Sequence, residues 1–348
     1  MKYRKNILSL MVLLGLFFGA YFVYQFYKTF FWDNTQFEEK VAFVHIYEDD
    51  SFDDLLDKLS PLLISTNDFT AAAVKKGYNT RIKPGKFAIK KGSSNNDVVN
   101  SLRSKSLIVR VTFNNQERIQ NLAGRVAQQI APDSLTLLNA FLDPVFLKEN
   151  GLNESNAMSI YLPNSYDFFW NTTAENFRNK MWSSFNKFWT PERIAKAKKL
   201  GFKPKEVINL AAIVQKETVK TDERKRVAGV YVNRLKRRMK LQADPTVIYA
   251  IKHKMKNFDT VIKRVLYKDL KVKSPYNTYQ NKGLPPGPIT MPDISSIQAV
   301  LNPEKHNYIY FVADPSNPGY HLFASTGRQH NRNKRKYTDW LDKQRVYR

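Results

Sequence analysis

One glutamate stands out because its place in a helical pattern points to acid–base chemistry. Apolar residues recur at helical spacing from Val207 onward, and Glu217 falls on the same stripe at its end. A carboxyl group held against apolar surface tends to have a raised pKa, so it can stay protonated and act as a general acid. The alternative is a glutamate at a helix end with its head group in water, the usual place for this residue type.

Other kinds of reactive site are missing from the sequence. The absence of cysteine excludes disulfides, thiolate catalysis and cysteine-based zinc sites. The five histidines show no H-E-x-x-H or other close metal-binding spacing, and His321 and His330 only flank a predicted strand. Neither a phosphate-binding glycine loop nor a G-x-S-x-G elbow occurs. We therefore expect no metal and no cofactor.

The N-terminus predicts a membrane anchor. Lys2, Arg4 and Lys5 precede an uncharged run from Asn6 to Tyr27, which as a helix of about 33 Å would cross a hydrocarbon core of about 30 Å. A cleaved signal peptide would have an apolar region of about 7–15 residues and a small-residue cleavage site. We expect an uncleaved single-pass anchor, with the N-terminus cytoplasmic and residues 29–348 outside the membrane.

The strongly basic composition agrees with this placement. The net charge is +25, from 56 Lys and Arg against 31 Asp and Glu. A soluble basic protein would suggest nucleic acid as the first partner, but no RNP-type aromatic motif or recognition helix is present. Outside a membrane, anionic lipid headgroups and acidic cell-wall polymer fit better, and we expect no nucleic-acid partner.

The chain of 348 residues is long enough for two or three domains, and its fold class is predicted as α+β. The part after the anchor begins with a small unit that reads β-α-α-β, in which Ser51 and Asp54 have capping-box spacing. Its order and size resemble the LysM-type glycan-binding module, with a purely structural role as the alternative. The predicted segments are the cytoplasmic tip and anchor (1–28), a linker (29–40), the LysM-like module (41–104), a connecting α+β segment (105–177) and a mixed α+β catalytic domain with a basic C-terminal tail (178–348).

A glycan substrate would require one or two carboxyl groups. An ordinary glycosidase uses two, and the candidates for the second are Asp222, Glu223 and Asp244. All three also suit helix caps. A lytic transglycosylase needs one carboxylic acid, because a hydroxyl group of the substrate replaces water as the nucleophile. Glu217 alone would serve that reaction.

Several motifs in one order, within residues of about 205 to 331, make the interpretation specific. They are IVQKET, RVAGVYVNRL, LQADPTVIYAI, SPYNTYQNKGLPPGPI and YFVAD…HLFAST…HN. Together they resemble the membrane-anchored endolytic murein transglycosylase family of bacteria. In that family the glutamate of a K-E-T triplet is the catalytic acid/base, and here the triplet is Lys216-Glu217-Thr218.

The resemblance also implies residues that line a glycan cleft. Amides and tyrosines suit sugar hydroxyls and N-acetyl groups, although each of these residues could instead serve loop structure. Three departures from the family pattern are Gln215 in place of glutamate, Ala243 in place of threonine, and Met291-Pro292-Asp293 in place of N-P-G. The implied cleft residues are Gln242, Asp244, Thr246, Asn277, Thr278 and Tyr279.

Taken together, the sequence predicts an endolytic lytic transglycosylase of peptidoglycan. The resemblance implies cleavage of the β-1,4 bond between N-acetylmuramic acid and N-acetylglucosamine in nascent strands, with 1,6-anhydro ends, at the bacterial cytoplasmic membrane beside the synthesis machinery. The alternative is a membrane-anchored cell-wall binding or scaffold protein without catalysis. An intact Glu217 in an intact motif favours the enzyme.

Overall fold

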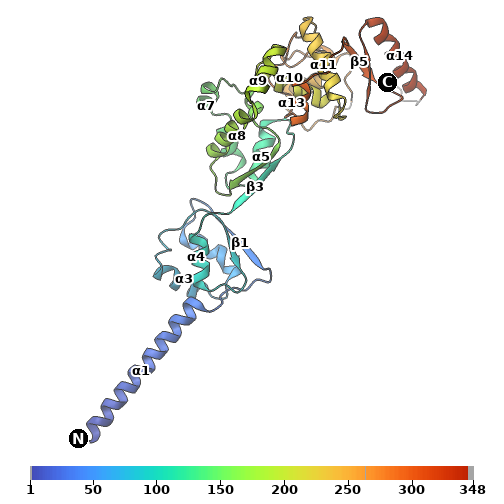
Figure 1. The fold of residues 1–348 in the computed structure, drawn as a ribbon. Helices are drawn as coiled ribbons and strands as arrows, with labels where there is room; N and C mark the ends of the chain where they lie inside the picture. Colours follow the sequence, from blue (N-terminus) through green and yellow to red (C-terminus); the bar gives the residue numbers. More distant parts are fainter. Residues whose placement is uncertain (1, 263, 344–348) are drawn as a thin grey trace. The chain divides into compact units, whose positions relative to one another are not determined.

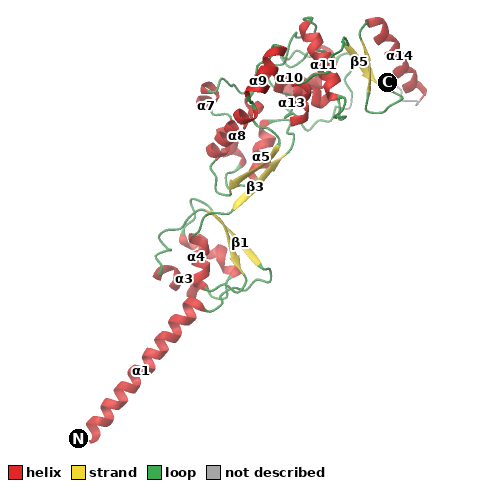
Figure 2. Cartoon of the chain, in the orientation of Figure 1, coloured by secondary structure: helices red, strands yellow, loops and turns green. Residues whose placement is uncertain are grey.

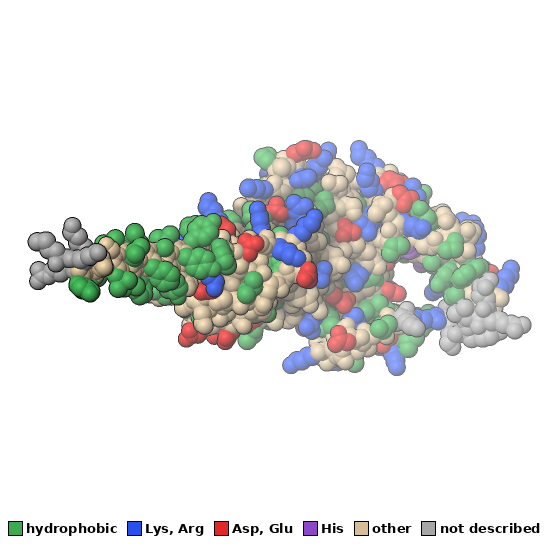
Figure 3. All heavy atoms as spheres, turned by 90° about the horizontal axis from the view of Figure 1, so that it is seen from below, with side chains coloured by type: hydrophobic (Ala, Val, Ile, Leu, Met, Phe, Trp, Pro, Cys, Tyr) green, Lys and Arg blue, Asp and Glu red, His purple; other side chains and the backbone are tan. Residues whose placement is uncertain are grey.

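The computed structural model describes residues 2–262 and 264–343, and it confirms a mixed α+β chain that begins with a long apolar helix. Helix α1 spans Lys2–Phe31, and its part from Asn6 to Phe31 is long and apolar enough to cross a membrane. Hydrophobic side chains cover its surface (Figure 3). The contacts of the chain divide it into two compact units (Figure 1).

The first unit comprises residues 1–110, 129–132 and 167–173. Its strands β1 and β2 pair antiparallel, with Val44 opposite Phe87. The order β1, α2, α3, β2 is the predicted β-α-α-β order, and its LysM character remains a prediction. The elements after α1 are β1 Val41–Ile46, α2 Phe52–Leu59, α3 Thr66–Lys75, β2 Gly85–Lys90 and α4 Asn95–Arg103.

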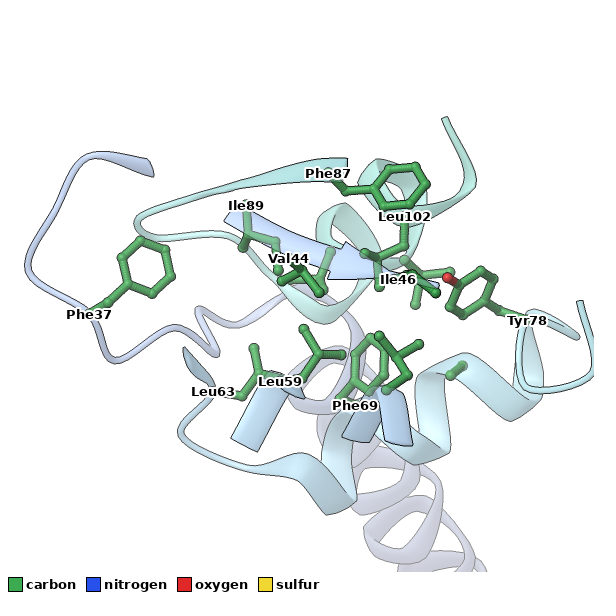
Figure 4. Close-up of a cluster of buried hydrophobic side chains, with 14 residues drawn as sticks. Phe37, Val44, Ile46, Leu59, Leu63, Phe69, Tyr78, Phe87, Ile89 and Leu102 are labelled. Atoms are coloured by element: carbon green, nitrogen blue, oxygen red, sulfur yellow. The ribbon is translucent and has the colours of Figure 1, made fainter. Parts of the chain in front are cut away.

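Local sequence signals explain these elements. Ser51 and Asp54 form the predicted capping box at the start of α2, and Ser94 and Asp97 form a second one at α4. Gly77 adopts a positive φ of 64° just after α3, a conformation that glycine accepts without steric cost. The apolar faces meet in one core that includes Val44, Ile46, Leu59, Phe69 and Phe87 (Figure 4).

The segment after α1 is folded onto this unit. Phe37 belongs to the apolar core. The Asn34 side chain donates to Asn95 Oδ1 at 2.6 Å and accepts from the Ser65 amide at 2.8 Å. Asn95 in turn donates to the Thr29 carbonyl at 2.8 Å, so the end of α1 is hydrogen-bonded to the unit.

The second unit comprises residues 111–128, 133–166 and 174–348. It is largely helical, with a β5–β6 hairpin near its C-terminal end (Figure 2). Strands β3 (Ile108–Phe113) and β4 (Asn164–Phe169) form a two-stranded sheet whose residues are divided between the two units. The remaining elements are α5 Ile119–Ala127, α6 Ser134–Phe141, α7 Pro144–Glu149, α8 Ala174–Phe188, α9 Pro191–Leu200, α10 Pro204–Glu217, α11 Arg224–Lys236, α12 Asp244–Met255, α13 Ile294–Leu301, β5 Tyr310–Ala313, β6 His321–Ala324 and α14 Gly327–Lys343.

Helix α10 is the centre of this unit. Pro204 begins the helix, and the Glu206 side chain accepts from the Lys203 amide at 2.7 Å. Every residue from Val207 to Val214 is buried, and α10 packs against α11, α12 and α13. The last residue of this buried helix is Glu217.

Candidate active site

The carboxyl group of Glu217 lies at the end of the buried helix and accepts one strong hydrogen bond. Its Oε1 accepts from the Tyr231 hydroxyl at 2.6 Å. Glu217 as a whole residue is half-buried, whereas Tyr231 is 1% exposed. Tyr231 is held edge-on against Phe311 of β5, with ring centroids 5.9 Å apart. Helix α11 and the β5–β6 hairpin therefore fix the hydrogen-bond donor of this site.

The surroundings raise the pKa of Glu217 to about 7 from its ordinary value of 4.5. Burial is the largest cause, and the negative charge of Asp244 adds to it. The hydrogen bond from Tyr231 and the positive charges of His321 and Arg234 oppose the rise. At neutral pH the carboxyl group is thus close to half protonated, and it can both donate and accept a proton.

Arg234 organises the backbone around this carboxyl group. It is 8% exposed, and its guanidinium donates to the Ile309 carbonyl at 2.6 Å and to the Leu241 carbonyl at 2.8 Å. It also donates to Gln242 Oε1 at 3.2 Å. The guanidinium forms no salt bridge within the described residues, so its charge adds to the field at Glu217 without neutralising a carboxylate of its own.

A pair formed by half-buried His321 and buried Glu223 lies near the site, and His321 is a second positive influence on Glu217. Glu223 is 4% exposed and accepts from the His321 amide at 2.8 Å, while its other oxygen lies 2.7 Å from His321 Nδ1. The cap predicted for the Glu223 side chain was wrong, because α11 has no side-chain cap and this carboxylate holds His321 instead. Asp222 accepts from the Tyr320 hydroxyl at 3.0 Å.

The residues implied by the resemblance divide into accessible and buried groups. Gln242, Asp244 and Tyr279 have accessible side chains, and the Tyr279 hydroxyl donates to Asp244 Oδ1 at 2.6 Å. Gln242 has a positive φ of 50°, which a residue with a Cβ adopts at a cost in strain. The cap predicted for Asp244 was wrong, since α12 has no side-chain cap and this carboxylate serves Tyr279.

Thr246, Asn277 and Thr278 are buried, and their polar atoms bond within the protein. The Thr246 and Thr278 hydroxyls lie 2.8 Å apart, and Thr246 donates to the Ala243 carbonyl at 2.6 Å. The Asn277 amide donates to the Leu270 and Val272 carbonyls. In this structure the three side chains hold the two loops that present Gln242, Asp244 and Tyr279.

Two departures from the family pattern are neighbours in space. Gln215 Nε2 donates to Asp293 Oδ2 at 3.0 Å, and its Oε1 accepts from the Ser296 hydroxyl at 2.6 Å. Arg224 also donates to Asp293, at 3.3 Å. A glutamate at position 215 would face the Asp293 carboxylate and repel it. The amide of Gln215 can instead donate a hydrogen bond to Asp293, so the two departures are compatible with each other.

Sequence reasoning missed Tyr231, Arg234 and the pairing of His321. Tyr231 and Arg234 lie in the RVAGVYVNRL motif, but no role was predicted for either of them. Within residues 2–262 and 264–343, no three or more His, Asp or Glu side chains lie close enough together to hold a metal ion.

Comparisons with known proteins find similar sequences and a similar fold. The YceG-like family model matches residues 44–336. An endolytic murein transglycosylase of Bacillus subtilis is 45% identical over 132 residues, which is 38% of this chain and 34% of that protein. One from Streptococcus pneumoniae strain D39 is 33% identical over 171 residues, 49% of this chain and 30% of that protein. The matches therefore span about a third of the length of these curated relatives.

A solved structure shows the same fold over most of the chain. It is that of a yceG-like protein from Listeria monocytogenes, with a TM-score of 0.55 and 26% sequence identity. The alignment covers 85% of this chain and 99% of that one.

Proposed function

This chain belongs to the YceG-like family, and we propose that it is a membrane-anchored lytic transglycosylase of peptidoglycan in which Glu217 is the single general acid/base. The observation that carries the proposal is a carboxyl group at the end of a buried helix, with a pKa of about 7 and one hydrogen bond, from a buried tyrosine to Oε1. The names of the matched relatives supply the substrate class of the proposal.

The proposed reaction uses each state of Glu217 once. The protonated carboxyl group donates its proton to the glycosidic oxygen as the bond from the anomeric carbon of N-acetylmuramic acid breaks. The 6-hydroxyl oxygen of the same sugar then bonds to that carbon, and its proton passes to the Glu217 carboxylate. The products are a 1,6-anhydro end and a free N-acetylglucosamine 4-hydroxyl, and the acid is regenerated without water.

The neighbouring residues have distinct parts in this proposal. Tyr231 donates to Oε1, which leaves Oε2 to carry the acidic proton and stabilises the carboxylate between the two transfers. Asp244 and Tyr279 are proposed cleft residues together with Gln242. Thr246, Asn277 and Thr278 support them from below the surface.

We further propose that α1 anchors the enzyme with its N-terminus in the cytoplasm, so that the catalytic unit acts on strands outside the membrane, next to the machinery that makes them. The uncharged stretch of α1 from Asn6 supports the anchor, and the basic residues before it support this orientation.

The decisive experiment is mass spectrometry of peptidoglycan digested by the full-length protein in detergent, beside Glu217→Gln. We expect anhydro-muramyl ends from the wild type and a loss of about 10²–10⁴-fold in the variant, because the amide has no acidic proton. Reducing ends would instead indicate hydrolysis, with Asp244 as the first candidate for the second carboxylate. Equal cleavage by both proteins would overturn the role of Glu217, and no cleavage by either would favour a scaffold.

A further inference from the structure

A pocket lies in the same unit as Glu217, at the end of α12 that is remote from Asp244. It encloses about 350 Å³, within the range of roughly 300–1,000 Å³ of small-molecule sites. His253 follows Asp244 by nine residues, so it lies about 13.5 Å along the helix axis. We call this the α12 pocket. The lining residues that matter below are Arg118, Glu154, Tyr249, His253, Lys256 and Tyr276.

One wall of the α12 pocket is aromatic. The rings of Tyr249 and Tyr276 lie 4.6 Å apart, and Phe258 meets Tyr249 edge-on at 5.4 Å. His253 lies 5.5 Å from Tyr276. Both tyrosines are buried, so the wall is rigid and presents ring surface to any chain that enters.

The pocket also carries positive charge that no described residue neutralises. Arg118 lies over the Phe258 ring at 4.8 Å, and its Nε–H is buried without an acceptor among the described residues. The adjacent carboxylate, Glu117, is already bound by Lys252 at 3.1 Å and lies 3.7 Å from Lys216. Lys256 is exposed at the rim and forms no salt bridge within the described part of the chain.

These features define the chemistry of the ligand. An unpaired guanidinium in a partly apolar wall suits a carboxylate, which it can bind through two parallel hydrogen bonds. The exposed carboxylate of Glu154, which also lines the pocket, offers an acceptor to an amine. A chain that carries carboxylates and an amine on a flexible backbone has the character of a short peptide.

We propose that the α12 pocket binds a carboxylate of the peptide attached to the glycan strand, an inference that rests on the proposed function. Extended peptide spans about 3.3–3.6 Å per residue, so about four residues cover the 13.5 Å between Asp244 and His253. The Lys216–Glu117–Lys252 contacts join this wall to the residue that precedes Glu217. A strand with its peptide in the pocket would thus be held beside the catalytic carboxyl group.

The first test measures binding without catalysis. Peptide released from peptidoglycan by an amidase is titrated calorimetrically into the full-length protein in detergent, and so is the same peptide with its carboxylates amidated. We expect saturable binding to the wild type, and roughly tenfold weaker binding both for Arg118→Gln and for the amidated peptide. Lys256→Gln at the exposed rim is expected to weaken binding less.

Lys254→Gln is the matched control, because Lys254 is exposed on the same helix but does not line the pocket. It should bind the peptide as the wild type does. The pocket assignment is overturned if the wild type shows no saturable binding, or if Arg118→Gln and Lys256→Gln, with unchanged thermal transitions, bind as tightly as the control.

The second test separates this inference from the proposed function. The ratio of kcat/KM for peptide-bearing strands over amidase-treated strands should be about tenfold for the wild type and fall toward one in Arg118→Gln. If neither strand is cleaved while peptide binding depends on Arg118, the proposed function fails and the pocket stands. If both strands are cleaved equally and no peptide binds, the proposed function stands and the pocket assignment fails.

Discussion

Gln215 and Glu217 lie two residues apart on α10, yet their polar surroundings are opposite in kind. The Gln215 amide uses both ends, toward Asp293 and Ser296, and Arg224 pairs with the same Asp293. Glu217 has no salt bridge within the described residues and one hydroxyl donor, and its pKa rises to about 7. One helix end thus carries a satisfied polar cluster and an unsatisfied acid.

The difference shows how the protein raises the pKa of a carboxyl group. Burial destabilises the charged form of the carboxyl group, and a cation in direct contact would stabilise that form again. Near Glu217 the guanidinium of Arg234 is directed at backbone carbonyls, and His321 is directed at Glu223. Positive charge is therefore near enough to limit the rise in pKa but is held away from direct pairing.

The largest expected effect is on the pH dependence of the unfolding free energy, which Glu217→Gln should reduce. Because the folded-state pKa of Glu217 is raised, its contribution to stability is fully present below pH 4.5 and is lost as pH passes through about 7. The wild type should lose about 2–3 kcal/mol of unfolding free energy between pH 5 and pH 9 relative to the variant. Denaturant unfolding of both proteins across this range measures it, and parallel pH curves would contradict the assigned pKa.

Tyr231→Phe should reduce kcat by roughly 10–100-fold, because the carboxylate formed after the first proton transfer loses its donor. The same change should move the alkaline limb of the pH profile upward, since the hydrogen bond lowers the pKa of Glu217. The pH dependence of anhydro-end formation checks both. Tyr320→Phe, which loses only a bond to Asp222, is the control; an equal loss of activity there would show that the effect is not specific to Tyr231.

Gln215→Glu should destabilise the protein by about 1–2 kcal/mol at neutral pH, because it places a second carboxylate against Asp293. Asp293→Asn should restore much of that loss in the double variant, since its amide can donate to the new glutamate. Unfolding free energies of the two single variants and the double variant give the coupling directly. Additive changes would mean that the two side chains do not interact.

Deleting residues 1–28 should have the smallest effect. The unfolding free energy of the first unit should change by less than about 0.5 kcal/mol, because α1 from Asn6 to Lys28 is almost entirely exposed. Deleting residues 1–40 is the sharper comparison. It removes Phe37 from the core and the Asn34 bonds to Ser65 and Asn95, so a clear loss of stability is expected. Calorimetry of the two truncated proteins decides, and equal transitions would contradict the packing of this segment.

The sequence by itself determined several local elements and the place of Glu217 at the end of an apolar helical stripe. The apolar stripe predicted α10, and the Ser51 and Asp54 spacing predicted a capping box that the structure confirms. Hydropathy along the first thirty residues predicted a helix of membrane-spanning length, which α1 confirms by length and composition. These features depend on neighbours within a few residues, so periodicity and capping rules reach them.

Tertiary structure alone decided what surrounds that acid. Tyr231 donates a hydrogen bond to Glu217, and Arg234 and His321 act on it through their charge. These residues follow Glu217 by 14, 17 and 104 positions in the sequence, and no local pattern specifies that they lie near it. Thr246 and Thr278 are buried and hydrogen-bonded to each other, so they support the loops, whereas Tyr279 stays accessible and binds Asp244. The fold also places Gln215 against Asp293. The pKa of Glu217 is likewise a tertiary property, because desolvation depends on everything that packs around the carboxyl group.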